Sequence, residues 1–120
     1  MTPYMSLALS LIATIVVATG PVLAESGDEQ DCIYLSYIGR TPVIDNKTIL
    51  VEMRGNTYKR IDLLNRCGGL KLQGGFSYST SINKLCKHDP LIVLGAGNAC
   101  LIDKIVDITE EEARALKERS

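Results

Sequence analysis

The sequence predicts a mainly β fold: a small antiparallel sheet or partly closed barrel with one C-terminal helix and two disulfides. Three observations support this prediction. Apolar, β-branched segments alternate with glycine and asparagine turns after residue 32. Four cysteines lie in the same part of the chain. Near the C-terminus, a helix-capping motif precedes charged residues at helical spacing.

An uncharged apolar segment precedes this domain. The chain has 120 residues, with 13 Lys or Arg and 14 Asp or Glu, and none of these charged residues lies within residues 1–24. An apolar run over Leu7–Val17 ends at a Gly-Pro pair, and Ala24 offers a small residue at a cleavage position. We expect a signal peptide over 1–24, cleavage after Ala24, and a periplasmic or secreted mature form that does not span the membrane. The alternative is an uncleaved anchor, which lacks a basic flanking cluster.

Four cysteines in an exported chain predict disulfide bonds rather than a metal site. They are Cys32, Cys67, Cys86 and Cys100. Zinc ligands come as close cysteine pairs, whereas the nearest two cysteines here are 14 positions apart, so we expect no metal and no cofactor. Three pairings are possible. We choose Cys67 with Cys86, which closes a glycine-rich loop, and Cys32 with Cys100, which ties the start of the domain to a late strand.

The strands are expected within a single domain over residues 32–120, after a flexible acidic lead-in over 25–31. Apolar and β-branched segments mark them, and Arg54-Gly55-Asn56 supplies a hairpin turn. The expected strands cover residues 33–38, 42–44, 48–53, 57–63, 91–94 and 99–102. The continuous apolar run at 91–94 predicts burial on both faces. Double glycines within 65–75 predict a loop holding at most a short extended piece.

A helix is expected to end the chain. Thr109 and Glu112 form a capping-box pattern, in which each side chain bonds the other residue's backbone amide. Acidic residues follow the cap and basic residues come last, which suits the helix dipole. The spacing of Glu110 and Arg114 favours an ion pair. Only Ala113 and Leu116 offer an apolar face, so we expect weak docking.

The charge distribution is the strongest functional signal. Between Arg54 and His88 the chain carries one anion, Asp62, and seven cations: Arg54, Lys59, Arg60, Arg66, Lys71, Lys84 and Lys87. A basic face using Arg54, Lys59, Arg60, Arg66 and Lys71 would attract an anionic envelope component, such as a lipid headgroup or wall polymer, or an acidic protein. The near-neutral total charge argues against nucleic acid. The alternative is that the acidic flanks fold back and neutralise this segment.

Two other classes of function stay open. A small hydrolase would use His88 and Asp89 with a nearby hydroxyl such as Ser77, Ser79 or Ser81. Against this, His88-Asp89-Pro90 has the composition of a turn. A purely structural envelope component would show neither a pocket nor a basic face. We favour the hypothesis of a binding module. We expect no catalytic residues.

The cysteine order and three short motifs resemble a known family. The motifs are Cys67-Gly68-Gly69-Leu70, Leu85-Cys86 followed by Asp89, and Cys100-Leu101-Ile102 ahead of Ile108-Thr109-Glu110-Glu111. In these features the chain is similar to an uncharacterised family of small exported four-cysteine proteobacterial proteins, a domain of unknown function. The resemblance spans residues 32–116. It implies a disulfide-bonded β domain of the bacterial envelope, and it implies no activity.

Overall fold

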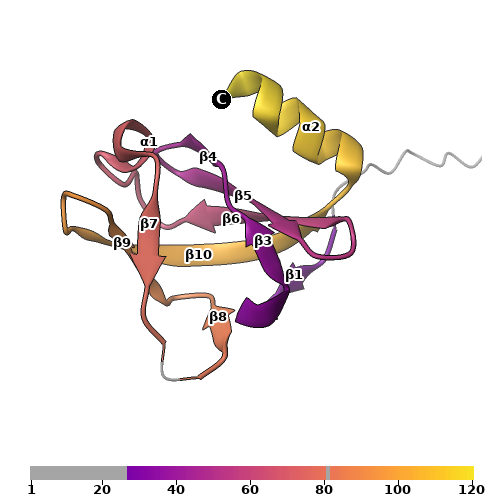
Figure 1. The fold of residues 1–120 in the computed structure, drawn as a ribbon, viewed down its shortest axis with the longest axis horizontal. Coiled ribbons are helices and arrows are strands. Elements are labelled where there is room, and N and C mark those ends of the chain that lie inside the picture. Colours follow the sequence, from indigo (N-terminus) through magenta and orange to yellow (C-terminus); the bar gives the residue numbers. More distant parts are fainter. Residues whose placement is uncertain (1–26, 81) are drawn as a thin grey trace, which may run out of the picture.

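A computed structural model describes residues 27–80 and 82–120, which form the expected mainly β domain with a C-terminal helix (Figure 1). The signal peptide expected over 1–24 lies outside the described residues. The elements are β1 (Glu29–Gln30), β2 (Cys32–Tyr34), the 3₁₀ turn η1 (Leu35–Tyr37), β3 (Ile38–Arg40), β4 (Val43–Asp45), β5 (Thr48–Met53), β6 (Thr57–Leu63), α1 (Leu70–Gln73), β7 (Phe76–Tyr78), β8 (Lys84–Cys86), β9 (Pro90–Val93), β10 (Ala99–Ile108) and α2 (Glu110–Arg119).

One antiparallel sheet curls into a half-barrel around the long strand β10. The strands follow the order β3-β5-β6-β10-β9-β7, with β4 beside β5 and β1 beside β10. One edge of β10 pairs with β6, and its other edge pairs first with β9 and then with β1. Strands β2 and β8 form a separate two-stranded sheet. The predicted β5–β6 hairpin is confirmed, with Asn56 at the positive φ of 63° that its turn requires.

The sheet has a buried core on each face. Alternate residues of β5 and β6 point in opposite directions, so Ile49 and Ile61 enter the larger cluster inside the half-barrel, whereas Leu50 enters a smaller cluster under α2. Because both faces are covered, Ile49, Leu50 and Val51 are all fully buried although they are consecutive.

The C-terminal helix begins at the predicted capping box. Thr109 accepts a hydrogen bond from the Glu112 amide at 3.1 Å, and the Glu112 carboxylate accepts one from the Thr109 amide at 2.9 Å. Ala113 is buried against the sheet. Two ion pairs add to this small apolar contact: Lys117 Nζ lies 2.7 Å from Glu52 Oε2, and Arg119 bonds Asp45 at 3.2 Å. The helix is therefore held at its C-terminal turn by charge as well as by packing.

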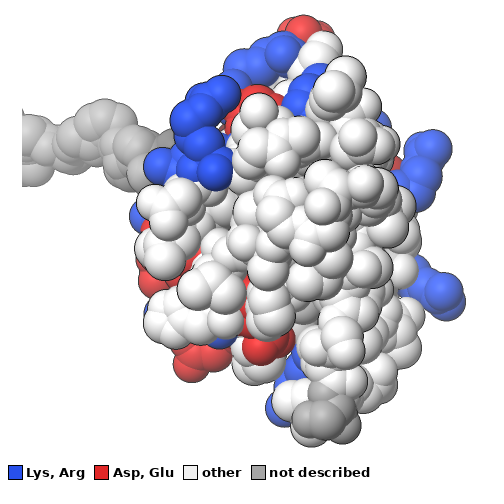
Figure 2. Space-filling model, turned by 90° about the vertical axis from the view of Figure 1, so that its left-hand side faces the viewer, with Lys and Arg blue, Asp and Glu red and all other residues white. Residues whose placement is uncertain are grey.

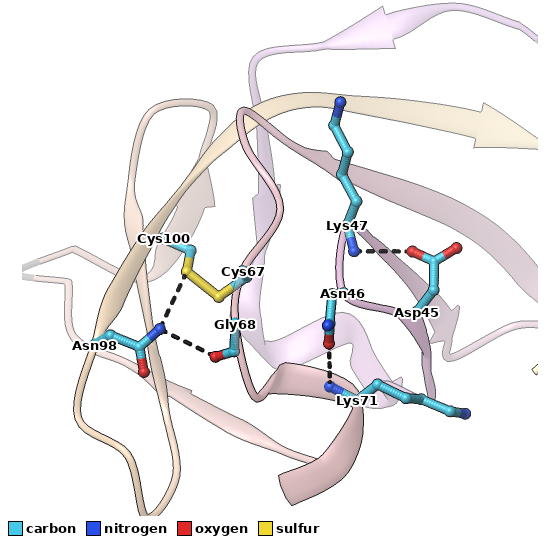
Figure 3. The surroundings of a disulfide bond; sticks show 8 residues. All are labelled: Asp45, Asn46, Lys47, Cys67, Gly68, Lys71, Asn98 and Cys100. Carbon is cyan, nitrogen blue, oxygen red and sulfur yellow. Dashed lines mark hydrogen bonds between the residues drawn. A yellow bond between two sulfur atoms is a disulfide. The ribbon is translucent and has the colours of Figure 1, made fainter.

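The expected disulfide pairing is wrong: the bonds are Cys32–Cys86 and Cys67–Cys100. Strand register explains the first, because Cys32 lies directly opposite Cys86 in the β2–β8 ladder. Figure 3 shows the second bond, which joins the loop after β6 to the start of β10. The spacing of the cysteines in the sequence reveals neither the β2–β8 pairing nor the position of this loop beside β10. Two disulfides indicate a protein of an oxidising compartment.

Two segments expected to be irregular are ordered parts of the domain. Within 25–31, the described residues 27–31 are not a flexible lead-in, because β1 pairs with β10 and the Gly27 amide donates to Asp107. The loop expected over 65–75 holds helix α1 rather than an extended piece. Gly69 and Gly74, both at positive φ, flank this turn of helix, and Leu70 buries its side chain in the core.

Three expected strands differ in extent or burial. Turn η1 divides the strand expected over 33–38 into β2 and β3. The last strand, β10, continues beyond residue 102 to Ile108. A bulge between Ile102 and Lys104 shifts its pairing register with β6 and sets Lys104 opposite Asp62. The run 91–94 is not buried on both faces: Leu91 and Val93 are buried, and Leu94 is half-exposed.

Candidate functional site

A hollow of about 260 Å³ opens where β1, β2 and η1 meet the β5–β6 hairpin. We call it the tyrosine hollow. It is lined by Gln30, Cys32, Ile33, Tyr34, Tyr37, Met53, Arg54, Thr57 and Lys59. Strand alternation explains the β6 contribution, because Thr57 and Lys59 share the inner face with Ile61. Its size suits one side chain or one small ligand group rather than a drug-sized molecule.

Two exposed tyrosines form one wall of the hollow. Tyr34 is 51% exposed and Tyr37 is 56% exposed, and their rings meet edge to face at 6.2 Å. The Lys84 ammonium lies 5.2 Å from the centre of the Tyr34 ring, a cation–π contact across the β2–β8 ladder. Tyrosine combines apolar area with a polar tip, which makes it frequent at binding surfaces.

Less exposed polar groups also line the hollow. Lys59 Nζ contacts Asp107 Oδ1 at 2.5 Å, a cross-strand ion pair in which the lysine side chain is only 13% exposed. Gln30 has a buried Oε1 with no hydrogen-bond partner among the described residues. A buried amide oxygen without a partner is costly, so this atom can gain from a donor supplied by water or a ligand.

The structure does not gather the five predicted basic residues on one face. Arg54 and Lys59 meet at the tyrosine hollow. Arg60 points to the opposite face of β6, where Asp62 accepts its hydrogen bonds at 2.9 and 3.1 Å. Arg66 and Lys71 follow the far end of β6, away from the turn that carries Arg54.

Some of these cations are also already bonded within the domain. Lys71 Nζ donates to the Val43 carbonyl at 3.1 Å, and Lys59 is paired with Asp107. Arg54 is exposed and forms no ion pair within residues 27–80 and 82–120. Of the five residues, Arg54 therefore combines a position at the hollow with an unneutralised charge.

The residues of the hydrolase alternative lie in a turn. His88 is exposed at a φ of 73°, between β8 and β9. The Asp89 carboxylate accepts the Cys86 amide at 2.7 Å, which closes that turn. Ser77 and Ser79 are exposed, and Ser81 lies outside the described residues. No described side chain is hydrogen-bonded to the His88 ring, so the geometry assembles no nucleophile–base pair here.

Comparisons with known proteins add no identity. No protein family, curated protein or solved structure matches this chain. Membership of the exported four-cysteine family therefore stays a prediction. Over residues 27–80 and 82–120, no helix is long and apolar enough to cross a bilayer. The same residues contain no cluster of three His, Cys, Asp or Glu side chains suited to a metal ion.

Tyr34 and Tyr37 are the exposed aromatic residues of the site that the sequence did not reveal. They are three positions apart, and both lie in the segment 33–38 that the sequence predicts to be one strand. Strand alternation would place them on opposite faces. Turn η1 breaks this alternation and brings both rings to one wall.

Proposed function

We propose that this chain is an exported, non-enzymatic binding module of the cell envelope, and that the tyrosine hollow takes an acidic segment of a partner protein. The observation that carries the proposal is the convergence of Arg54, Tyr34 and Tyr37 on one open hollow. Tyrosine and arginine are enriched among the few residues that carry most of the binding energy of protein interfaces. An acidic side chain entering beside Arg54 would be held by a charge-assisted hydrogen bond.

The charges around the hollow favour an anionic ligand. Arg54 at the rim and Lys84 on the Tyr34 ring are cationic, and the Lys59 charge is matched by Asp107. The apolar walls from Met53 and the two tyrosine rings favour a ligand with carbon surface around its charge. A bare phosphate headgroup would use only the cations, which is why we favour an acidic peptide over a lipid.

Two features of the chain support the proposed location outside the cytoplasm. The two disulfides favour an oxidising compartment, and residues 1–24 have the composition expected of a signal peptide that would be cleaved after Ala24. The resemblance to exported proteobacterial proteins agrees with a bacterial envelope. No observation in the described residues favours the hydrolase alternative.

A binding titration tests the proposal. Fluorescently labelled tetraglutamate peptide would be titrated with protein purified from cells expressing the full chain, with tetralysine as the opposite-charge probe. We expect saturable binding of tetraglutamate that weakens as salt is raised, because exposed charges are screened. Arg54→Glu should weaken it at least about tenfold, since it replaces attraction by repulsion at the rim.

Arg66→Glu is the matched control. Arg66 is also exposed, but it follows the far end of β6, so the same charge change should leave peptide affinity within about twofold. Equal losses in both variants would mean that the peptide senses only net charge. Preference for anionic vesicles over tetraglutamate would replace the protein partner by a lipid, and absence of binding to either would favour a purely structural component.

A further inference from the structure

Strand β7 ends the sheet with an unpaired edge. It is the last strand in the pairing order and pairs only with β9 among the described strands. The Leu94 amide donates to the Gly75 carbonyl at 3.1 Å. Because hydrogen-bonded and non-hydrogen-bonded pairs alternate along an antiparallel ladder, the backbone groups of Gly75 and Ser77 are the ones that face β9. The backbone groups of Phe76 and Tyr78 therefore point away from β9, and no backbone bond from described residues occupies them. Such an edge is a template for another strand.

Charged side chains do not protect this edge. No charged residue occurs in residues 72–83 or 90–102. Figure 2 shows this end of the molecule, whose centre is a broad area without charge. Half-exposed Leu94 and 85% exposed Leu72 add apolar surface. The opposite edge differs, because β3 carries Arg40 and Pro42 follows it, both common devices against edge pairing.

The uncharged end is held in place by several contacts. The disulfide Cys67–Cys100 ties the α1 loop to β10, and the Asn98 side chain donates to the Gly68 carbonyl at 3.2 Å (Figure 3). The Leu94 side chain packs closely on Gly75: a Cβ atom added to Gly75 would lie 3.0 Å from Cδ1 of Leu94. A surface held in this way loses little conformational freedom when a partner docks.

We propose that β7 pairs antiparallel with β7 of a second copy of this chain, extending the sheet across a twofold axis. We place the axis at Ser77, where the outward amides and carbonyls of Phe76 can pair with those of the second copy's Tyr78 and Ser77 faces its own counterpart in a non-hydrogen-bonded pair. A residue on a twofold axis faces itself, so an edge charge there would oppose its own like charge. An uncharged edge is self-complementary in this respect, which favours a second copy over a charged partner. This inference does not rest on the tyrosine hollow.

Charge placed at the axis tests the pairing. The protein would be purified from cells expressing the full chain, and its sedimentation would be measured over a concentration series. The same series would be measured for the Ser77→Lys and Ser77→Glu variants. The Ser77 side chain is exposed, so both variants keep the β7–β9 ladder. We expect each charge to weaken self-association at least about fivefold, and an equimolar mixture of the two to restore it as a mixed dimer.

Ser36→Lys is the matched control, because Ser36 is exposed on η1, away from β7. It should leave self-association unchanged. A chain that stays monomeric across the series would overturn the proposal, as would a dimer that Ser77→Lys leaves intact. Equal weakening by Ser36→Lys would also overturn it, and so would a mixture of the two charged variants that fails to associate.

Discussion

Removing each disulfide separately gives the most quantitative test of the fold. Cys32 and Cys86 would be replaced together by alanine, and Cys67 and Cys100 likewise in a second variant. The bonds join residues 54 and 33 positions apart. Restriction of the unfolded chain then gives each bond about 4 kcal/mol, and the longer loop exceeds the shorter by only about 0.5 kcal/mol. Either loss is a large share of the whole stability of a small domain.

Packing reverses the order that loop length predicts. Cys67 is only 1% exposed and belongs to the larger core cluster, so truncating it to alanine also removes buried contacts worth about 1 kcal/mol. Cys32 and Cys86 are partly exposed. We therefore expect the Cys67→Ala, Cys100→Ala variant to be the less stable of the two, although it opens the shorter loop.

Urea and thermal unfolding followed by circular dichroism measure both losses. A loss of about 4 kcal/mol should lower the Tm by about 15–30 °C in a domain of this size. A loss below about 1 kcal/mol in either variant would refute the stabilising role of that bond. If the Cys32→Ala, Cys86→Ala variant were less stable by more than about 1 kcal/mol, the packing argument would be wrong.

Three further substitutions probe the helix and the core. The Lys117 ammonium beside Glu52 lowers the pKa of that carboxyl below its ordinary 4.5, so the contact stabilises the fold above about pH 4.5 and is lost as pH falls through the lower folded pKa. Because Lys117 is half-exposed, Glu52→Gln should cost under about 1 kcal/mol at pH 7 and less at pH 3 in urea titrations, and an equal cost at both would contradict the ion pair. Thr109→Ala should lower the free energy of unfolding by about 1 kcal/mol and speed hydrogen exchange in α2, whereas unchanged exchange would show that the Glu112 capping box is not needed. Ile61→Ala, at a side chain with no exposure, should cost about 2–5 kcal/mol, and a smaller loss in chemical denaturation would mean that the core collapses around the gap.

Local patterns made the hairpin and the helix predictable. Gly55 and Asn56 accept the positive φ that a tight hairpin turn needs at two positions, and they lie between two β-branched segments. Thr109 and Glu112 satisfy each other's backbone amides without help from the rest of the fold. Both elements are set by residues close together in the chain.

Three of the misses depend on partners that are distant in the sequence. The cysteine pairing follows from β2 lying beside β8, which no spacing reveals. Strand β10 runs through Asp103 and Lys104 because a bulge places Lys104 opposite Asp62, whereas charged residues in sequence suggest that the strand has ended. Lys59 and Arg60 are neighbours in sequence yet occupy opposite faces of β6, so a basic segment did not become a basic face.

Mapping a ligand onto individual residues tests the central claim most directly. Amide shifts of the isotope-labelled protein would be followed by NMR while tetraglutamate is added. Binding at the tyrosine hollow predicts the largest shifts at Tyr34, Tyr37, Arg54 and Thr57, with little change at Arg66 and Lys71. Shifts concentrated at Arg66 and Lys71, or shifts spread evenly over all surface cations, would contradict it.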